Sequence, residues 1–204
     1  MSEVRKQARL PRLDREQQLL SVAMTIFVAR GYQGSTVEDI AFAAGVTRPI
    51  VYKHYGSKDQ IYLACLRYAR TLLDASLLTQ AFKNDSLSAR LLAAAEGYFA
   101  FVETHQTPWR LLYESGTAVA GMASEENKRL RAKTVEQVFQ LLREVAVNVS
   151  DLELMIRANA ISGAGEQLAK WWVMHPDVSK EQVVSALYDF SWAGLSKFSP
   201  PCLP

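Results

Sequence analysis

The stretch STVEDIAFAAGVTRPIVYKHYGSK, residues 35–58, decides the fold of this chain. At its start, the hydroxyl groups of Ser35 and Thr36 can accept hydrogen bonds from the free backbone N–H groups of a helix, and Glu38 or Asp39 can complete a capping box. Apolar residues then recur at three- and four-residue steps, which predicts a short helix with one buried face. These residues are Val37, Ile40, Ala41 and Ala44.

A tight turn at Gly45 is predicted to end this helix, because glycine readily adopts the positive φ that terminates helices. Thr47 is a candidate cap for a second helix, and Pro49 falls in its first turn, where a missing N–H group costs nothing. Two short helices joined by a tight turn form a helix-turn-helix. We therefore expect this motif in the stretch 35–58.

The composition of the chain favours a globular protein in the cytoplasm. Its 204 residues are 49% hydrophobic and 22% charged, which allows a substantial core. No apolar run approaches the roughly 20 residues that a membrane-spanning helix needs, and no apolar segment of a secretory signal follows the basic N-terminus. The two cysteines, Cys65 and Cys202, are too few for a disulfide framework. We expect no membrane partner.

The charge is distributed unevenly around a net value of +2. Residues 1–70 hold 11 Lys and Arg against 6 Asp and Glu, whereas residues 71–204 hold 12 against 15. The basic end therefore also carries the helix-turn-helix, as binding to nucleic acid requires. Chance clustering is the alternative explanation.

Four basic residues precede the first expected helix. They are Arg5, Lys6, Arg9 and Arg12. They form either an arm that touches DNA phosphates or a solvated, mobile terminus, and the sequence leaves both open.

Helical periodicity continues along the rest of the chain, and no convincing alternating strand pattern interrupts it. Beyond the helix-turn-helix, the expected helices cover residues 14–29, 58–78, 86–105, 108 to about 116, 124–148, 151–175 and 179–198. The sequence thus predicts an all-α fold of about nine helices. We expect a three-helix DNA-binding head at residues 1–56 and a helical domain for ligand binding and dimerisation at residues 57–204. No Gly/Ser-rich hinge separates them, so the helix after Ser57 should join them rigidly.

A set of residues at fixed spacing resembles the tetracycline-repressor (TetR) family of bacterial transcription regulators over about residues 13–65. These residues are Phe27, Gly31, Tyr32, Ser35, Thr36, Val37, Ile40, Ala41, Ala44, Gly45, Val46, Thr47, Tyr52, His54, Tyr55, Ser57 and Lys58. The resemblance implies a homodimer that places the second helix of each motif in successive major grooves, about 34–36 Å apart.

The resemblance also implies which residues contact DNA. Arg48, Pro49 and Lys53 would face base edges, where an arginine can pair with guanine and a proline can only make apolar contact. A second group would grip phosphates, which sets the register without reading sequence. This group comprises Thr36, Thr47, Tyr52, His54 and Lys58. Packing within the head is the alternative role for Tyr52 and His54.

The C-terminal part is expected to bind a ligand and to dimerise. A small lipophilic effector would lie between the middle helices, against walls from Tyr98, Phe101, Trp109, Leu112, Tyr113 and Met122. Polar recognition would come from one helix face that carries Asn159, Ser162 and Glu166. The family resemblance implies dimerisation through the last two long helices, for which the sequence offers a stripe of Leu187, Phe190, Ala193, Gly194 and Phe198. The alternative is that the aromatics and the stripe pack only inside their own chain.

Enzyme and metal chemistry find no support in the sequence. The three histidines show no metal-ligand spacing with each other or with a cysteine, and no phosphate loop or nucleophile elbow is present, so we expect no cofactor. We expect a homodimeric repressor that a small lipophilic effector releases from a palindromic DNA operator. The alternatives are a TetR-like activator, or a helical small-molecule-binding or scaffold protein that does not bind DNA.

Overall fold

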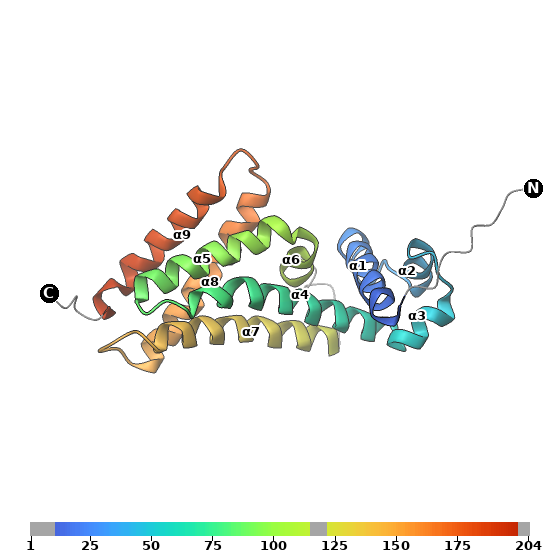
Figure 1. Cartoon of the computed structure of the whole chain (residues 1–204), viewed down its shortest axis with the longest axis horizontal. Helices are drawn as coiled ribbons and strands as arrows, with labels where there is room; N and C mark the ends of the chain where they lie inside the picture. The colour runs from blue at the N-terminus through green and yellow to red at the C-terminus, as the bar shows by residue number, and fades with distance from the viewer. Residues whose placement is uncertain (1–10, 115–121, 200–204) are drawn as a thin grey trace, which may run out of the picture.

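The computed structural model describes residues 11–114 and 122–199, and it confirms the all-α prediction. Within these ranges the chain forms nine α-helices and one short 3₁₀ helix, without a strand (Figure 1). The helices are α1 (Arg12–Arg30), α2 (Val37–Ala43), α3 (Arg48–Tyr55), α4 (Lys58–Ala81), α5 (Leu87–Thr104), α6 (Gln106–Tyr113), α7 (Met122–Arg143), α8 (Asp151–Val173) and α9 (Lys180–Leu195), with η2 at Ser196–Phe198.

The three N-terminal helices gather at one end of an elongated molecule, and α5 to α9 form its larger part (Figure 1). The long helix α4 starts beneath the head and runs into the larger part, where α5 and α7 pack along it. In turn, α8 packs on α7 and α9, and α9 packs on α5. We call helices α1–α3 the head and helices α5–α9 the body.

The head owes its shape to local signals in the sequence. Thr36 is the N-cap of α2 and forms a capping box with Asp39: the Asp39 amide donates to Thr36 Oγ1 at 3.1 Å, and the Thr36 amide donates to Asp39 Oδ2 at 2.9 Å. Of the candidate pairs in the sequence, the structure therefore selects Thr36 with Asp39. Gly45 has a φ of +65°, as its predicted place in the turn requires.

The start of α3 differs from the expectation in one detail. Thr47 occupies the N-cap position, but its side chain makes no capping hydrogen bond. Pro49 lies in the first turn of α3 as predicted. Gly56, at a φ of +73°, ends the helix and lets α4 begin two residues later.

Aromatic side chains join the head to α4. Tyr62 of α4 is fully buried, with its ring edge-on to Phe27 of α1 at 5.0 Å and to Tyr32 at 5.2 Å. The same hydrophobic core continues from Leu19 in α1 to Leu187 in α9. Helix α4 crosses this core without a break, so one continuous packed core links the head to the rest of the molecule.

The helices of the body approach closely where the sequence has glycine. A Cβ atom on Gly97 in α5 would overlap the backbone carbonyl oxygen of Ser76 in α4. Only glycine therefore permits the observed contact between α4 and α5.

Among the helix boundaries that differ from the sequence prediction, two have a clear physical reason. Helix α6 begins at Gln106, two residues before Pro108, since a proline is tolerated in the first turn. Helix α7 ends at Arg143 rather than near residue 148, because the Val147 amide donates to the Phe198 carbonyl at 2.9 Å and Asn148 has a φ of +55°. Among the described residues, no helix has the length and apolar character to cross a membrane.

Candidate nucleic-acid interface and effector cavity

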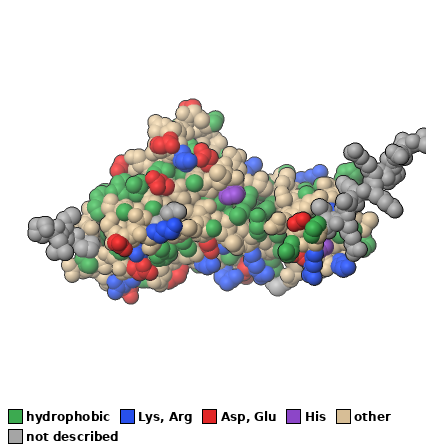
Figure 2. Space-filling model, in the orientation of Figure 1, with side chains coloured by type: hydrophobic (Ala, Val, Ile, Leu, Met, Phe, Trp, Pro, Cys, Tyr) green, Lys and Arg blue, Asp and Glu red, His purple; other side chains and the backbone are tan. Residues whose placement is uncertain are grey.

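Helix α3 presents most of its surface to solvent. Val51 is its fully buried residue and anchors the helix to the core of the head. The sequence-predicted base readers Arg48, Pro49 and Lys53 are all exposed, as is Tyr52. Lys and Arg side chains line the lower edge of the head in Figure 2, where Figure 1 places α3. This helix therefore has the exposure and the charge that contact with DNA requires.

Arg48 is held by neighbours on both helices of the motif. Its Nε atom lies 2.6 Å from Glu38 Oε1 on α2, and its Cζ atom lies 5.8 Å from the centre of the Tyr52 ring on α3. A hydrogen bond with Tyr52 and the nearby Glu38 carboxylate raise the pKa of the Arg48 guanidinium, which stays charged in any case.

The predicted phosphate contacts have different surroundings. The Thr36 hydroxyl is engaged by Asp39, to whose Oδ2 atom it donates at 2.7 Å, whereas Thr47 is exposed. The Lys58 ammonium lies 4.2 Å from the centre of the Tyr32 ring, and partial burial lowers its pKa. These positions are compatible with phosphate contact, and the contacts stay predictions.

His54 faces the first helix instead of open solvent. Its side chain is 13% exposed, and its Nδ1 atom lies 3.3 Å from Glu16 Oε1. The hydroxyl of the next residue, Tyr55, donates to the Glu16 carbonyl at 3.1 Å. The packing role that the sequence left open for His54 thus has direct support, and a phosphate contact at this residue stays a prediction.

An apolar cavity of about 60 Å³ lies in the body. Its lining comes from α4 through α9 and contains no charged side chain. The lining residues are Leu77, Leu91, Ala94, Ala95, Tyr98, Tyr113, Thr134, Val138, Leu141, Ile161, Ser162, Gly165, Leu187, Tyr188 and Ser191. A lining of this kind suits an apolar ligand with a few polar contacts.

The cavity contains three of the nine sequence-predicted effector residues, namely Tyr98, Tyr113 and Ser162. Phe101 and Trp109 are fully buried core residues outside its lining, and Leu112 borders a smaller hollow beside it. The side chain of Met122 lies outside the part of the chain that the structure describes. The sequence missed the walls from α7 and α9, because small and apolar helix residues give no signal that separates a cavity wall from core.

The polar helix face predicted on α8 does not act as one unit. Ser162 lines the cavity, but Asn159 is exposed and its amide donates to the Met155 carbonyl at 2.9 Å. Glu166 does not line the cavity and forms ion pairs with Arg131 at 2.8 Å and with Lys170 at 2.6 Å.

One hydroxyl in the cavity differs from the other polar groups around it. Tyr98 accepts a hydrogen bond from Trp109 Nε1 at 3.2 Å, and Ser191 donates to the Leu187 carbonyl at 2.7 Å. Ser162 Oγ is buried and has no hydrogen-bond partner among the described residues. A ligand in the cavity can therefore gain a hydrogen bond at Ser162 without breaking one.

A polar network joins the cavity to α4, and sequence reasoning did not find it. The guanidinium of Arg70 is buried, lies 2.5 Å from Asp74 Oδ1 and donates to the Leu130 carbonyl at 2.9 Å and to the hydroxyl of Thr134. Thr134 is itself a cavity wall. Arginine in a helix usually marks a solvated face, so only the packing of α7 on α4 reveals this contact.

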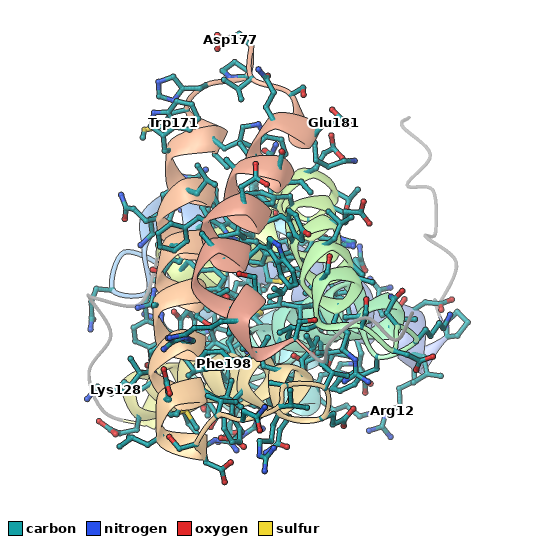
Figure 3. All side chains as sticks on the ribbon, turned by 90° about the vertical axis from the view of Figure 1, so that its left-hand side faces the viewer. Arg12, Lys128, Trp171, Asp177, Glu181 and Phe198 are labelled. Carbon is teal, nitrogen blue, oxygen red and sulfur yellow. The ribbon has the colours of Figure 1, made fainter. Side chains whose placement is uncertain are left out.

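The outer faces of α8 and α9 carry exposed apolar side chains (Figure 3). Phe190 is 60% exposed, and Ala193 and Gly194 beside it are also exposed. Of the other residues predicted for a dimer interface, Leu187 and Phe198 are buried within their own chain. The large exposed apolar residues on α8 are Leu152, Ile156 and Trp171, and Met174 directly after its end is also exposed.

Metal binding and thiol chemistry have little basis in the described residues. No group of three or more His, Cys, Asp or Glu in residues 11–114 and 122–199 is arranged to hold a metal ion. Cys65 is buried, and burial raises the pKa of its thiol, so the reactive thiolate is disfavoured. Cys202 lies outside the described residues.

Comparison with known proteins accounts for both parts of the chain. The family model described as "Bacterial regulatory proteins, tetR family" matches residues 19–65, and that described as "Tetracyclin repressor-like, C-terminal domain" matches residues 87–194. The HTH-type transcriptional activator FasR of Mycolicibacterium smegmatis is 30% identical over 94% of this chain and 88% of its own length. The probable acrEF/envCD operon repressor of Escherichia coli is 25% identical over 83% of this chain and 81% of its own length.

A solved structure agrees with the fold as a whole. The TetR-like transcriptional regulator from Rhodococcus sp. RHA1 superposes with a TM-score of 0.77 at 29% identity, over 92% of this chain and 99% of that chain. Sequence, fold and the exposed basic helix α3 lead to one conclusion. The chain belongs to the TetR family of DNA-binding transcriptional regulators and is not an enzyme.

Proposed function

We propose that this regulator is a homodimeric repressor that leaves a palindromic operator when a small lipophilic effector enters the cavity of the body. The observation that carries the proposal is the course of α4. Leu77, near its C-terminal end, lines the cavity, and Tyr62, near its N-terminal end, is buried against Phe27 of the head. A change in the cavity can thereby reach α3 through one continuous helix.

The size of the cavity supports an expansion of its walls on effector binding. At about 60 Å³ it is smaller than the roughly 150 Å³ cavity that accepts benzene in an engineered protein. We propose that an effector with several carbon atoms fills the cavity by moving its walls apart. Such an effector binds the expanded conformation better than the compact one, and this difference is what shifts the population.

The same lining supports an uncharged ligand. A charge placed among apolar side chains would lose its hydration without a partner to offset the loss. One hydrogen-bonding group on the ligand would instead meet Ser162. We propose Ser162 as the polar anchor in place of Glu166, because the Glu166 carboxylate is engaged by Arg131 and Lys170.

The dimer is proposed to form through the exposed faces of α8 and α9. Phe190, Ala193 and Gly194 would pack against the same residues and the exposed apolar side chains of α8 in a second copy, which would make a four-helix bundle. A dimer of this kind would present two α3 helices to DNA. Arg48, Pro49 and Lys53 would read bases, while Thr36, Thr47, Tyr52, His54 and Lys58 would contact phosphates.

Binding to DNA that flanks the gene, followed by fluorescence anisotropy, tests the head. We expect sequence-selective binding that weakens steeply with salt, and we expect the Arg48→Ala, Lys53→Ala double variant to lose it while keeping its helical content. Binding that is indifferent to both salt and sequence would refute the proposal. Light scattering tests the dimer: Phe190→Glu should yield monomers, whereas Phe82→Glu, a control at a side chain that is 38% exposed outside α8 and α9, should not.

The cavity is tested with 1-octanol and octanoate as probes. We expect octanol to raise the melting temperature and to weaken DNA binding, and octanoate to do neither. Ser162→Ala should weaken octanol binding about fivefold or more, because one hydrogen bond is lost. Ser191→Ala is the matched control, since its hydroxyl is already paired within the chain. An equal effect of the two variants would remove Ser162 as the anchor.

An activator is the second candidate, and the 30% identity to the activator FasR favours it. Both candidates use the same DNA-binding head, so binding measurements cannot separate them. A promoter–reporter fusion can: deletion of the regulator raises reporter output if the protein is a repressor and lowers it if the protein is an activator.

A further inference from the structure

Glu38 carries a negative charge on the helix-turn-helix, where phosphates would repel it. The sequence offered Glu38 or Asp39 as the acid of a capping box, and the structure gives that role to Asp39. The Glu38 side chain is 49% exposed and takes no part in the capping box of α2. The carboxylate therefore calls for another explanation.

The contact of Glu38 crosses the turn to the proposed base reader. Its Oε1 atom lies 2.6 Å from Nε of Arg48, whose side chain remains 55% exposed. The centre of the Tyr52 ring lies 5.8 Å from Cζ of the same guanidinium. Arg48 is thus restrained from α2 and from α3 while it still reaches solvent.

The geometry of the guanidinium group allows Arg48 to contact Glu38 and a DNA base at the same time. The group is planar and carries five N–H donors, so the ion pair at Nε and the hydrogen bond with Tyr52 still leave N–H donors to match O6 and N7 of guanine. An unrestrained arginine loses rotamer entropy when DNA binding fixes its side chain. A carboxylate that fixes the side chain beforehand reduces this loss and also fixes its direction.

We propose that Glu38 is a positioning residue for sequence reading: it holds Arg48 so that the guanidinium meets one base edge, and it thereby narrows the range of operators that the protein accepts. This inference rests on the proposed base-reading role of Arg48. It gives the Glu38 carboxylate two opposite effects. Repulsion from phosphates lowers affinity for every DNA sequence, and restraint of Arg48 raises discrimination at one base pair.

The experiment uses the full-length protein and duplexes of roughly 30 base pairs, long enough for two half-sites. The duplexes are selected from a random library by the wild-type protein, and affinities are then measured by anisotropy for the selected sequence and its single-base-pair substitutions. Arg48→Ala identifies the pair that Arg48 reads, as the position where discrimination disappears. At that position we expect Glu38→Gln to reduce discrimination about three- to tenfold, and elsewhere to leave it unchanged. Affinity for unselected duplexes should rise.

Asp14→Asn is the control for charge alone, because it removes one exposed carboxylate from the head without touching Arg48. Glu38→Gln could instead change the affinity for every duplex by the same factor, as Asp14→Asn is expected to do. That result would show that repulsion of phosphates is the only role of Glu38, and it would overturn the inference. Sharper discrimination in Glu38→Gln would show that the pair restrains Arg48 from DNA, which also overturns it. If Arg48→Ala weakens all duplexes equally, base reading by Arg48 fails and the inference fails with it, whereas the other outcomes leave the proposed function intact.

Discussion

Replacement of Gly165 by alanine tests the cavity through two measurable quantities. Gly165 lies inside α8 and lines the cavity. A Cβ atom there would lie 3.5 Å from Leu187 Cδ2 and 3.7 Å from Tyr98 Cε1, which are ordinary packing distances. The methyl group would therefore enter the cavity without displacing a wall.

The expected gain in stability follows from two contributions. Alanine is favoured over glycine in a helix interior by about 1 kcal/mol, and a buried methyl group adds about 0.8 kcal/mol. We expect Gly165→Ala to raise the free energy of unfolding by about 1–2 kcal/mol, measured by urea denaturation at a fixed protein concentration, because dimerisation would make stability depend on concentration. The same methyl group takes up ligand space, so octanol should bind about tenfold more weakly.

The same substitution at Gly97 provides the opposite control. Its Cβ atom would overlap the Ser76 backbone carbonyl, which cannot move without displacing α4. We expect Gly97→Ala to destabilise the protein by about 1–3 kcal/mol despite the better helix propensity of alanine. A loss of stability in Gly165→Ala would refute the cavity geometry. A gain in stability with unchanged octanol binding would instead show that octanol binds outside the cavity.

Three further predictions concern groups that fix α4. The arginines around Glu126, Arg129 first, lower the pKa of the Glu126 carboxyl to about 2 from an ordinary value near 4.5. The stabilising effect of the Glu126 carboxylate is therefore complete above about pH 4.5 and is lost as the pH falls toward 2. The difference in melting temperature between wild type and Glu126→Gln should disappear over that range. In a Cys202→Ser variant, Cys65 should not react with iodoacetamide at pH 8 until the protein is unfolded, because its thiol is buried. Mass spectrometry would detect the alkylated cysteine. Rapid alkylation of the folded protein would contradict the burial of Cys65. Arg70→Leu should cost about 3 kcal/mol in urea denaturation, because Asp74 loses its buried partner; a cost below about 1 kcal/mol would show that Lys133 alone is a sufficient partner for that carboxylate.

The helix-turn-helix was predictable because its signals are local. The capping box, the glycine turn and the proline in the first turn of α3 all act within a few residues of the chain. A sequence can express such signals completely. The roles of single residues were harder to predict: Thr47 occupies the cap position without a capping bond, and Glu38 pairs with an arginine ten positions away.

Long-range contacts account for what the sequence could not predict. The end of α7 depends on a hydrogen bond from Val147 to Phe198, and the role of Glu166 depends on Arg131 from another helix. Helical periodicity indicated which residues of α5 and α8 turn inward, so Tyr98 and Ser162 were predicted as cavity residues. Periodicity does not indicate which inward-facing residues line a cavity, because that depends on how six helices pack together.

The polar network around Arg70 supports the proposed route from the cavity to the head. A ligand that presses on Thr134 presses on a residue that accepts a hydrogen bond from Arg70, and Arg70 lies on α4 between the cavity and the head. The guanidinium cannot follow α7 freely, since it is also paired with Asp74 on its own helix. Expansion of the cavity must therefore either break buried polar contacts, at a cost of several kcal/mol, or carry α4 along with α7. We propose that the second response prevails; because the Tyr62 ring packs on Phe27, it would move the DNA-binding head as well.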